Sequence, residues 1–126
     1  MHLTHFLKKI IWPVVIFLLL SVFNAHGQEI GKRAKEMFNQ AVDQIEQENT
    51  AQAIDYLDQA IRLQAEFSRA YLERGKLYFT LDSTQQARKD MDKALSLDKD
   101  FGEACFYMGY FDYLGEKPDS PVEKFT

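Results

Sequence analysis

The sequence repeats itself with a fixed period, since Ala53 recurs as Ala87 and 87 − 53 = 34. Other small and apolar residues recur at the same step, in the pairs Ala60/Ala94, Leu63/Leu97, Phe67/Phe101 and Ala70/Ala104. A small residue occurs three times at this spacing, as Ala41, Gly75 and Gly109. Periods of roughly 20–50 residues are typical of proteins that stack one supersecondary unit on the next. The period therefore predicts a stacked repeat domain.

Each unit contains two helical patterns. Tyr71, Arg74, Gly75 and Tyr78 fall at i, i+3, i+4 and i+7, which is one face of a helix. A second helix follows with the same spacing of small and apolar residues, at Ala87, Met91, Ala94 and Leu97. The small side chains on both stripes allow the two helices to pack closely and antiparallel. The pattern predicts an all-α fold with helices over 31–47, 50–64, 68–81, 84–97 and 102–114, and a short helix from 120.

The predicted helix starts also recur. Residues 49–52 (Asn-Thr-Ala-Gln) and 83–86 (Ser-Thr-Gln-Gln) each have a short polar residue followed three positions later by glutamine, and residues 120–123 end in glutamate instead. This is the pattern of a capping box, in which the polar side chain accepts a hydrogen bond from an early backbone N–H of the helix. We expect side-chain caps at Asn49, Ser83 and Ser120.

The residues of the second unit resemble the tetratricopeptide repeat. The resemblance rests on an aromatic, glycine and aromatic on the first helix and on small and apolar residues on the second, namely Tyr71, Gly75, Tyr78, Ala87, Ala94 and Leu97. It covers residues 68–101 best, residues 34–67 less well, and the unit from 102 to 126 only at its beginning. It implies a right-handed stack of antiparallel helix pairs with about two and a half repeats in the domain 28–126.

The resemblance also implies a concave groove lined by the first helix of each unit. The partner-binding residues that it implies are Phe38, Val42, Arg69, Leu72, Lys76, Phe79, Phe106, Tyr110 and Tyr113. Some relatives capture the C-terminal carboxylate of a partner with lysine, asparagine and arginine, but Phe38, Glu73 and Glu103 stand at three of those positions here. An apolar or aromatic protein segment suits this groove better. The stripe formed by Phe38 and Val42 could also belong to the core.

The segment 1–27 has the organisation of a secretory signal peptide. Lys8 and Lys9 precede an apolar run from position 10 to position 23, and Ala25-His26-Gly27 offers small residues at a cleavage site. We expect cleavage after Gly27 and export to the periplasm or the extracellular space. The alternative is an uncleaved membrane anchor, although the apolar run, which contains Pro13, is shorter than the roughly 20 residues that span a bilayer.

The composition of residues 28–126 argues against several kinds of function. This part has no histidine, and Lys8 and Lys9 account for two of the 15 basic residues, which leaves 13 against 19 acidic residues and a net charge of −6. An acidic domain lacks the cationic surface that nucleic-acid binding requires. Catalytic histidines, metal-ligand clusters and phosphate-binding glycine loops are missing from the sequence, so we expect neither an enzyme nor a cofactor. We expect Cys105 to be packed and inert, and Arg74 to pair with Asp90.

The third unit differs from the other two in its spacing and its apolar content. The step from Gly75 to Ser83 is 83 − 75 = 8, whereas the step from Gly109 to Ser120 is 120 − 109 = 11. The helix over 102–114 is rich in aromatic residues, although terminal repeats normally present a polar outer face. Three covers are open: residues 115–126, a second copy of the chain, or a partner. We predict a non-catalytic module that binds a protein or peptide; the alternative is a structural subunit that assembles with itself through this aromatic helix.

Overall fold

The computed structural model describes residues 2–116, and these form five helices without a strand: α1 (His2–Glu46), α2 (Thr50–Leu63), α3 (Ser68–Thr80), α4 (Thr84–Leu97) and α5 (Gly102–Glu116). The predicted all-α fold is confirmed, and the predicted starts of α2, α3, α4 and α5 coincide with the observed ones. The helix predicted from residue 120 lies outside the described residues. The predicted helix ends lie within two residues of the observed ones, and the large difference is the start of α1, which lies far ahead of residue 31.

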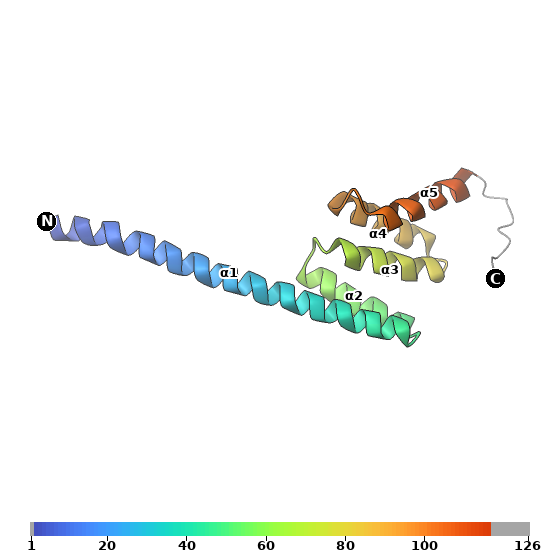
Figure 1. The fold of residues 1–126 in the computed structure, drawn as a ribbon, viewed down its shortest axis with the longest axis horizontal. Coiled ribbons are helices and arrows are strands. Elements are labelled where there is room, and N and C mark those ends of the chain that lie inside the picture. The colour runs from blue at the N-terminus through green and yellow to red at the C-terminus, as the bar shows by residue number, and fades with distance from the viewer. Residues whose placement is uncertain (1, 117–126) are drawn as a thin grey trace.

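The helices pack as two antiparallel pairs followed by a single helix (Figure 1). The C-terminal part of α1 pairs with α2, α3 pairs with α4, and α5 lies against α4. Alanines occupy the closest contacts, and those fully removed from solvent are Ala34, Ala41, Ala53, Ala60, Ala70, Ala87, Ala94 and Ala104. Most of these residues recur along the sequence, because a small side chain is needed wherever two helix backbones approach closely. Larger side chains, with Leu57 and Met91 fully buried, fill the space between these contacts.

Helix α1 is a single rod of 45 residues that extends well beyond the repeat domain (Figure 1). It continues through Pro13, and its first buried residue is Ala34. Residues 2–29 are exposed throughout, including Trp12 and Phe23. An 18-residue window of this part is apolar enough to cross a membrane, a property that a signal sequence near an N-terminus shares. The sequence patterns of the two roles overlap, since both depend on an apolar helix.

Removal of residues 1–27 should leave the repeat domain intact, because none of residues 2–33 is buried. We expect residues 28–126 to melt within about 2 °C of the full chain, since exposed residues contribute little to the free energy of unfolding. Thermal unfolding followed by tyrosine fluorescence measures this, because all the tyrosines lie between positions 56 and 113. A markedly lower melting temperature for the shorter chain would contradict the prediction.

The two turns inside the helix pairs have the same backbone conformation. Glu48 and Asp82, which are one period apart (82 − 48 = 34), have positive φ angles of 61° and 56°. The backbone N–H of Asn49 donates to Gln44 O, and that of Ser83 donates to Tyr78 O, both at 2.9 Å. The left-handed residue reverses the chain, and the backbone bonds close the turn. The repeat is therefore encoded in backbone geometry as well as in packing.

The predicted side-chain caps at Asn49 and Ser83 are wrong. Both residues occupy the N-cap position, but neither side chain makes a capping hydrogen bond. Their ψ angles are 67° and 63°, outside the extended region that directs an N-cap side chain to the helix amides. The Asn49 Nδ2 instead donates to Gln44 Oε1 at 3.0 Å. The predicted cap at Ser120 lies outside the described residues.

Gly75 and Gly109 occupy equivalent positions in the repeat but have different surroundings. A Cβ atom added to Gly75 would lie 3.0 Å from Met91 Cε, 3.1 Å from Asp90 Cβ and 3.3 Å from Ala87 O. A Cβ added to Gly109 would meet no atom of the described residues within 4 Å. Close approach of α4 therefore requires glycine on α3, whereas α5 has space at the matching position.

Leucine at these two positions should change stability in opposite directions. Gly75→Leu should lower the free energy of unfolding by about 2 kcal/mol, because the side chain must displace α4. Gly109→Leu should raise it by roughly 0.5–1 kcal/mol, because leucine is the better helix former and an added Cβ meets no atom of residues 2–116 within 4 Å. Urea denaturation of the two variants measures both effects. Destabilisation by Gly109→Leu would show that this face of α5 is covered in the isolated protein.

Candidate binding surface

The nine predicted partner-binding residues lie on α1, α3 and α5, the first helices of the three units. Two of them are part of the core. Phe38 packs against Phe67, with ring centroids 5.0 Å apart, and Leu72 is 1% exposed within the cluster that contains Ala94 and Phe111. Phe38 therefore belongs to the core, which was the alternative prediction for this residue. The expectation that Leu72 lines an open groove is wrong. The reason is that consecutive first helices cover each other along this line.

Four of the predicted residues are half-buried, namely Val42, Lys76, Phe79 and Tyr110. The Lys76 Nζ lies 2.9 Å from Glu103 Oε1 and 3.3 Å from Glu73 Oε2, so it connects α3 to α5. Burial acts to lower the pKa of Lys76, but the hydrogen bond to Glu103 and the charges of both glutamates outweigh it and raise this pKa above its usual value. Lys76 is consequently engaged within the domain and has little freedom to bind a partner's carboxylate.

Phe79 joins the half-buried residues to the last helix. Its ring centroid is 5.7 Å from those of Tyr107, Tyr110 and Phe111, each in an edge-to-face arrangement. Edge-to-face packing is favoured by the aromatic quadrupole and contributes beyond simple burial. This aromatic cluster holds α5 in place and leaves only part of Tyr110 accessible.

The remaining three predicted residues are exposed or nearly so. Arg69 lies over the Phe38 ring, with its guanidinium carbon 5.8 Å from the ring centroid. Phe106 and Tyr113, both on α5, are 69% and 51% exposed. With Tyr110 between them, they form an aromatic surface that we call the end face (Phe106, Tyr110, Tyr113). In residues 30–114, outside the apolar part of α1, the large exposed apolar side chains are Leu81, Phe106 and Tyr113.

The opposite side of α5 is buried against the repeat domain. Ala104 is fully buried and Phe111 is 2% exposed, and both belong to the cluster around Met91 and Ala94. Cys105 is exposed, so the expectation that it is packed is wrong. The helix turns about 100° per residue, which takes Cys105 away from the side on which Ala104 is buried. Arg88 on α4 also pairs with Asp112 on α5 at the surface.

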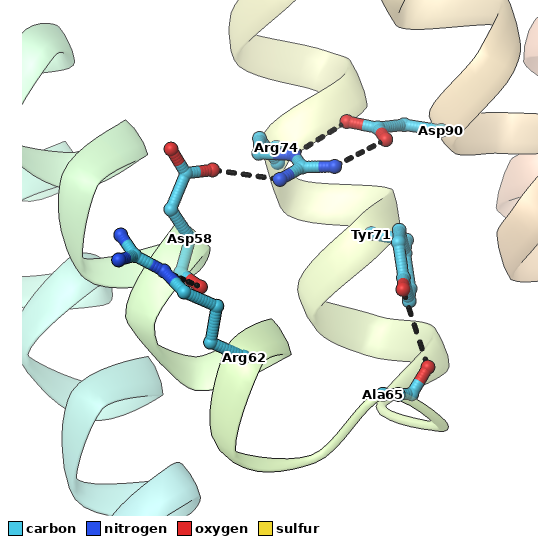
Figure 2. Close-up of polar contacts among 6 residues, drawn as sticks. All are labelled: Asp58, Arg62, Ala65, Tyr71, Arg74 and Asp90. Atoms are coloured by element: carbon cyan, nitrogen blue, oxygen red, sulfur yellow. Dashed lines mark hydrogen bonds and ion pairs between the residues drawn. The ribbon is translucent and has the colours of Figure 1, made fainter.

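The best-defined polar site is centred on Arg74 (Figure 2). Its Nε and Nη2 donate to the two carboxylate oxygens of Asp90 at 2.8 and 2.7 Å, and its Nη1 donates to Asp58 Oδ1 at 2.6 Å. The predicted Arg74–Asp90 pair is thus confirmed. The hydrogen bond to Asp90 does most to raise the pKa of Arg74 above its ordinary value, against the opposing effect of burial. Arg74 joins α2, α3 and α4 through these two carboxylates.

The sequence analysis missed Asp58 and the cleft beside it. An open cleft of about 430 Å³ between α2, α3 and α4 is lined by residues that include Asp58, Arg62, Arg74, Tyr78 and Lys89. Burial raises the pKa of Tyr78 there. The equal spacing of Asp58, Arg74 and Asp90 (74 − 58 = 16 and 90 − 74 = 16) was the available signal. Since three Arg74 N–H groups are already satisfied by carboxylates, the geometry is that of a structural ion-pair network.

The polar site around Arg74 contains one buried carboxylate, Asp90. Within residues 2–116, no three histidine, cysteine, aspartate or glutamate side chains are grouped so that they could hold a metal ion. The buried carboxylate Asp90 is fully engaged by Arg74, which leaves it no role as a general base. What the surface offers is aromatic area and helix faces, which are means of binding.

Comparison with known proteins agrees with this description. Residues 68–101, which form α3, α4 and the turn after it, match the family model of the tetratricopeptide repeat. This segment is a tetratricopeptide repeat. The tetratricopeptide-repeat domain of OM64 from Arabidopsis has a similar structure, with a TM-score of 0.65 and 21% identity over 71% of this chain and 74% of that chain. MamA is similar with a TM-score of 0.55 and 20% identity.

The match to MamA covers 70% of this chain and 61% of the MamA chain. At such identities the two structures establish the tetratricopeptide-repeat fold. No curated protein sequence matches this chain. Tetratricopeptide repeats generally serve protein–protein interaction and not catalysis, so the predicted family, the helical stack and the broad role as an interaction module are supported.

Proposed function

We propose that this protein is an exported, non-catalytic binding module that takes up an apolar or aromatic protein segment on the side formed by α1, α3 and α5. The observation that carries the proposal is the 69% exposure of Phe106 beside Tyr110 and the half-exposed Tyr113 on α5. Exposed aromatic side chains that gather on one helix favour a binding role, because aromatic residues are enriched at the centres of interfaces. Arg69 adds a cationic group on α3.

The proposed location is outside the cytoplasm. It is supported by the basic start, the apolar run and the small residues of segment 1–27, and by the exposure of residues 2–29. Such a segment can direct export without any part in the repeat fold. N-terminal sequencing of the protein recovered from expressing cells tests this. A start at Gln28 supports cleavage, whereas an intact Met1 in the membrane fraction would show that the segment is an anchor.

Selection of peptides against the full chain in detergent tests the binding role. We expect enriched peptides to be rich in aromatic and aliphatic residues, and Phe106→Ala to weaken the best of them about 30-fold, which corresponds to a hot-spot residue of about 2 kcal/mol. Gln59→Ala on α2, outside the proposed surface, is the matched control. Peptides whose affinity is unchanged by Phe106→Ala and by Tyr110→Ala would contradict the proposed surface.

The second candidate function is self-assembly through α5. The same exposed aromatic residues favour it, because a copy of the chain could cover the end face. Light scattering after size exclusion, over a concentration series, distinguishes the two functions. A dimer that dissociates in the Phe106→Ala variant would make assembly the leading function, and a monomer at all concentrations would exclude it.

A further inference from the structure

One face of α5 is equivalent, by the repeat, to the face of α3 that packs against α4. In the second unit, the residues of α3 that meet α4 are Tyr71, Arg74, Gly75 and Tyr78. Adding the period of 34 gives Cys105, Met108, Gly109 and Asp112 on α5. We call this second set the open seat. It differs from the end face, which consists of Phe106, Tyr110 and Tyr113.

The seat on α3 is closely filled. Arg74 is bound to Asp90 of α4, and any Cβ at Gly75 would press against α4. Residues 2–116 leave most of the seat on α5 unfilled, because Cys105, Gly109 and Asp112 are exposed and Gly109 has nothing within 4 Å of an added Cβ. Met108, the fourth residue, is half-buried against the cluster around Met91. Within residues 2–116, therefore, this face of α3 carries a helix and the equivalent face of α5 does not.

The chain does not turn back onto this seat within the described residues. Helices α1 and α3 end one period apart, at Glu46 and Thr80, and each is followed by a left-handed residue that reverses the chain. The position one period after Asp82 is Glu116 (82 + 34 = 116), and this residue is still part of α5. Helix α5 thus passes the point at which the other two first helices turn.

Gly109 is an unfavourable residue for an isolated helix. Glycine in a helix interior costs about 1 kcal/mol relative to alanine, and at Gly75 this cost is offset by the close approach of α4. No close approach offsets it at Gly109 among residues 2–116. Gly109 lies in the middle of the 15-residue helix α5. A second helix that approaches Gly109 as closely as α4 approaches Gly75 accounts for a glycine at this position.

We propose that the open seat docks a helix of a different protein in the place that α4 occupies on α3. The equivalence defines the chemistry of this helix. It carries alanine or glycine opposite Gly109, because only a small residue allows the close approach. It carries an apolar residue opposite Met108, where α4 has Asp90 opposite Arg74.

Charge defines the flanks of the partner helix and distinguishes it from a second copy of the chain. Glu103, Asp112 and the last residue, Glu116, are the charged residues of α5, which contains no lysine or arginine. Asp112 pairs with Arg88, yet its side chain remains 62% exposed, so it can accept a second cation. Basic flanks therefore suit the partner, whereas a second α5 would bring together two helices whose charged residues are all acidic.

Two other helices of a copy, α2 and α4, are also unsuited to the open seat. Helices α2 and α4 already use their small-residue faces within their own pairs, with Ala53, Ala60, Ala87 and Ala94 fully buried. A copy would have to open one of these pairs to offer either α2 or α4. The proposal concerns a different face from the end face, so it stands or falls separately from the proposed function.

Cys105 reports directly on the seat, because it is exposed, lies within it and is the only cysteine of the chain. The experiment uses the full chain in detergent and, as its probe, a peptide of residues 83–98 with Asp90→Leu, which matches the apolar Met108. The rate of Cys105 alkylation by N-ethylmaleimide is measured with and without this peptide. A shuffled peptide of the same composition is the control.

We expect the alkylation rate to fall about tenfold when the peptide is present at about ten times its Kd, because only the unoccupied fraction reacts. In Gly109→Leu the ratio of the rates with and without peptide should return to one. In Gly109→Ala the ratio should lie between that of the unmodified chain and that of Gly109→Leu. An unchanged rate at millimolar peptide, or equal protection in Gly109→Leu, would overturn the proposal. Protection that rises with protein concentration alone would identify a second copy, and slow alkylation at every dilution would identify the protein's own chain; either result overturns it.

Discussion

Replacement of Phe111 by alanine will lower the free energy of unfolding by about 4 kcal/mol. Phe111 is the largest fully buried side chain in the described part of the chain, at 2% exposure, and its ring contacts Phe79 edge to face. Its loss leaves a cavity beneath α5 that a terminal helix cannot close by a small shift, because Ala104 already fixes the distance between the backbones. Urea denaturation followed by tyrosine fluorescence measures the change.

The matched control is Phe106→Ala, which removes the same side chain from the same helix. Because Phe106 is 69% exposed, its removal should change the free energy of unfolding by no more than about 0.5 kcal/mol. The two variants together separate the buried side of α5 from the end face. Equal losses in both would mean that Phe106 is covered in solution.

Asp90→Ala will lower the free energy of unfolding by about 3 kcal/mol, the lower end of the range for breaking a buried ion pair. The Asp90 side chain is only 5% exposed, and both its oxygens accept hydrogen bonds from Arg74. The variant leaves the Arg74 guanidinium partly buried with Asp58 as its remaining carboxylate. This remaining bond is the reason for choosing the lower end.

Asp92→Ala, two positions along the same helix and exposed, is the control for Asp90→Ala and should be nearly neutral. A double variant, Arg74→Met with Asp90→Leu, should recover most of the lost stability, because an apolar pair of similar volume has no desolvation penalty. If the double variant is no more stable than Asp90→Ala, the bond between Arg74 and Asp58 contributes more than its partial exposure suggests. Thermal denaturation of the three variants decides between these outcomes.

The fold could be predicted from the sequence to a large extent because the alanines report directly on helix contacts. Ala53, Ala60, Ala87 and Ala94 recur with the period, and all four are fully buried where α1 meets α2 and α3 meets α4. An alanine in a repeated position has few physical roles other than allowing close approach. The predicted limits of α2, α3 and α4 lie within one residue of the observed ones, since the turns between these helices are short.

The details that failed depend on geometry that periodicity does not contain. The polar residues Asn49 and Ser83 occur where caps are expected, but each follows a left-handed residue and has a ψ angle that turns the side chain away. Cys105 was misplaced because one step along a helix changes the face by about 100°. Asp58, the second carboxylate bound to Arg74, comes from the preceding unit, and contacts between units are not visible in the pattern of one unit.

The candidate surface was predicted in part. Placing Phe38, Leu72 and Phe106 at equivalent positions treats them alike, yet the first two are buried and the third is exposed. The difference arises because a following first helix covers Phe38 and Leu72, whereas nothing in residues 2–116 follows α5. Exposure at a repeated position thus depends on the position of its unit in the stack, which a family resemblance does not include.

The packing of each helix mainly against its neighbours in sequence has a consequence for how the domain folds and opens. Contacts between residues close in the chain form quickly, because little loop entropy is lost before they form, so folding should be fast. A terminal helix can detach without breaking contacts elsewhere, whereas α2 and α3 cannot. Backbone amide hydrogens should therefore exchange faster in α5 than in α2 and α3, so the surface proposed to bind partners belongs to the part of the repeat domain that opens most readily.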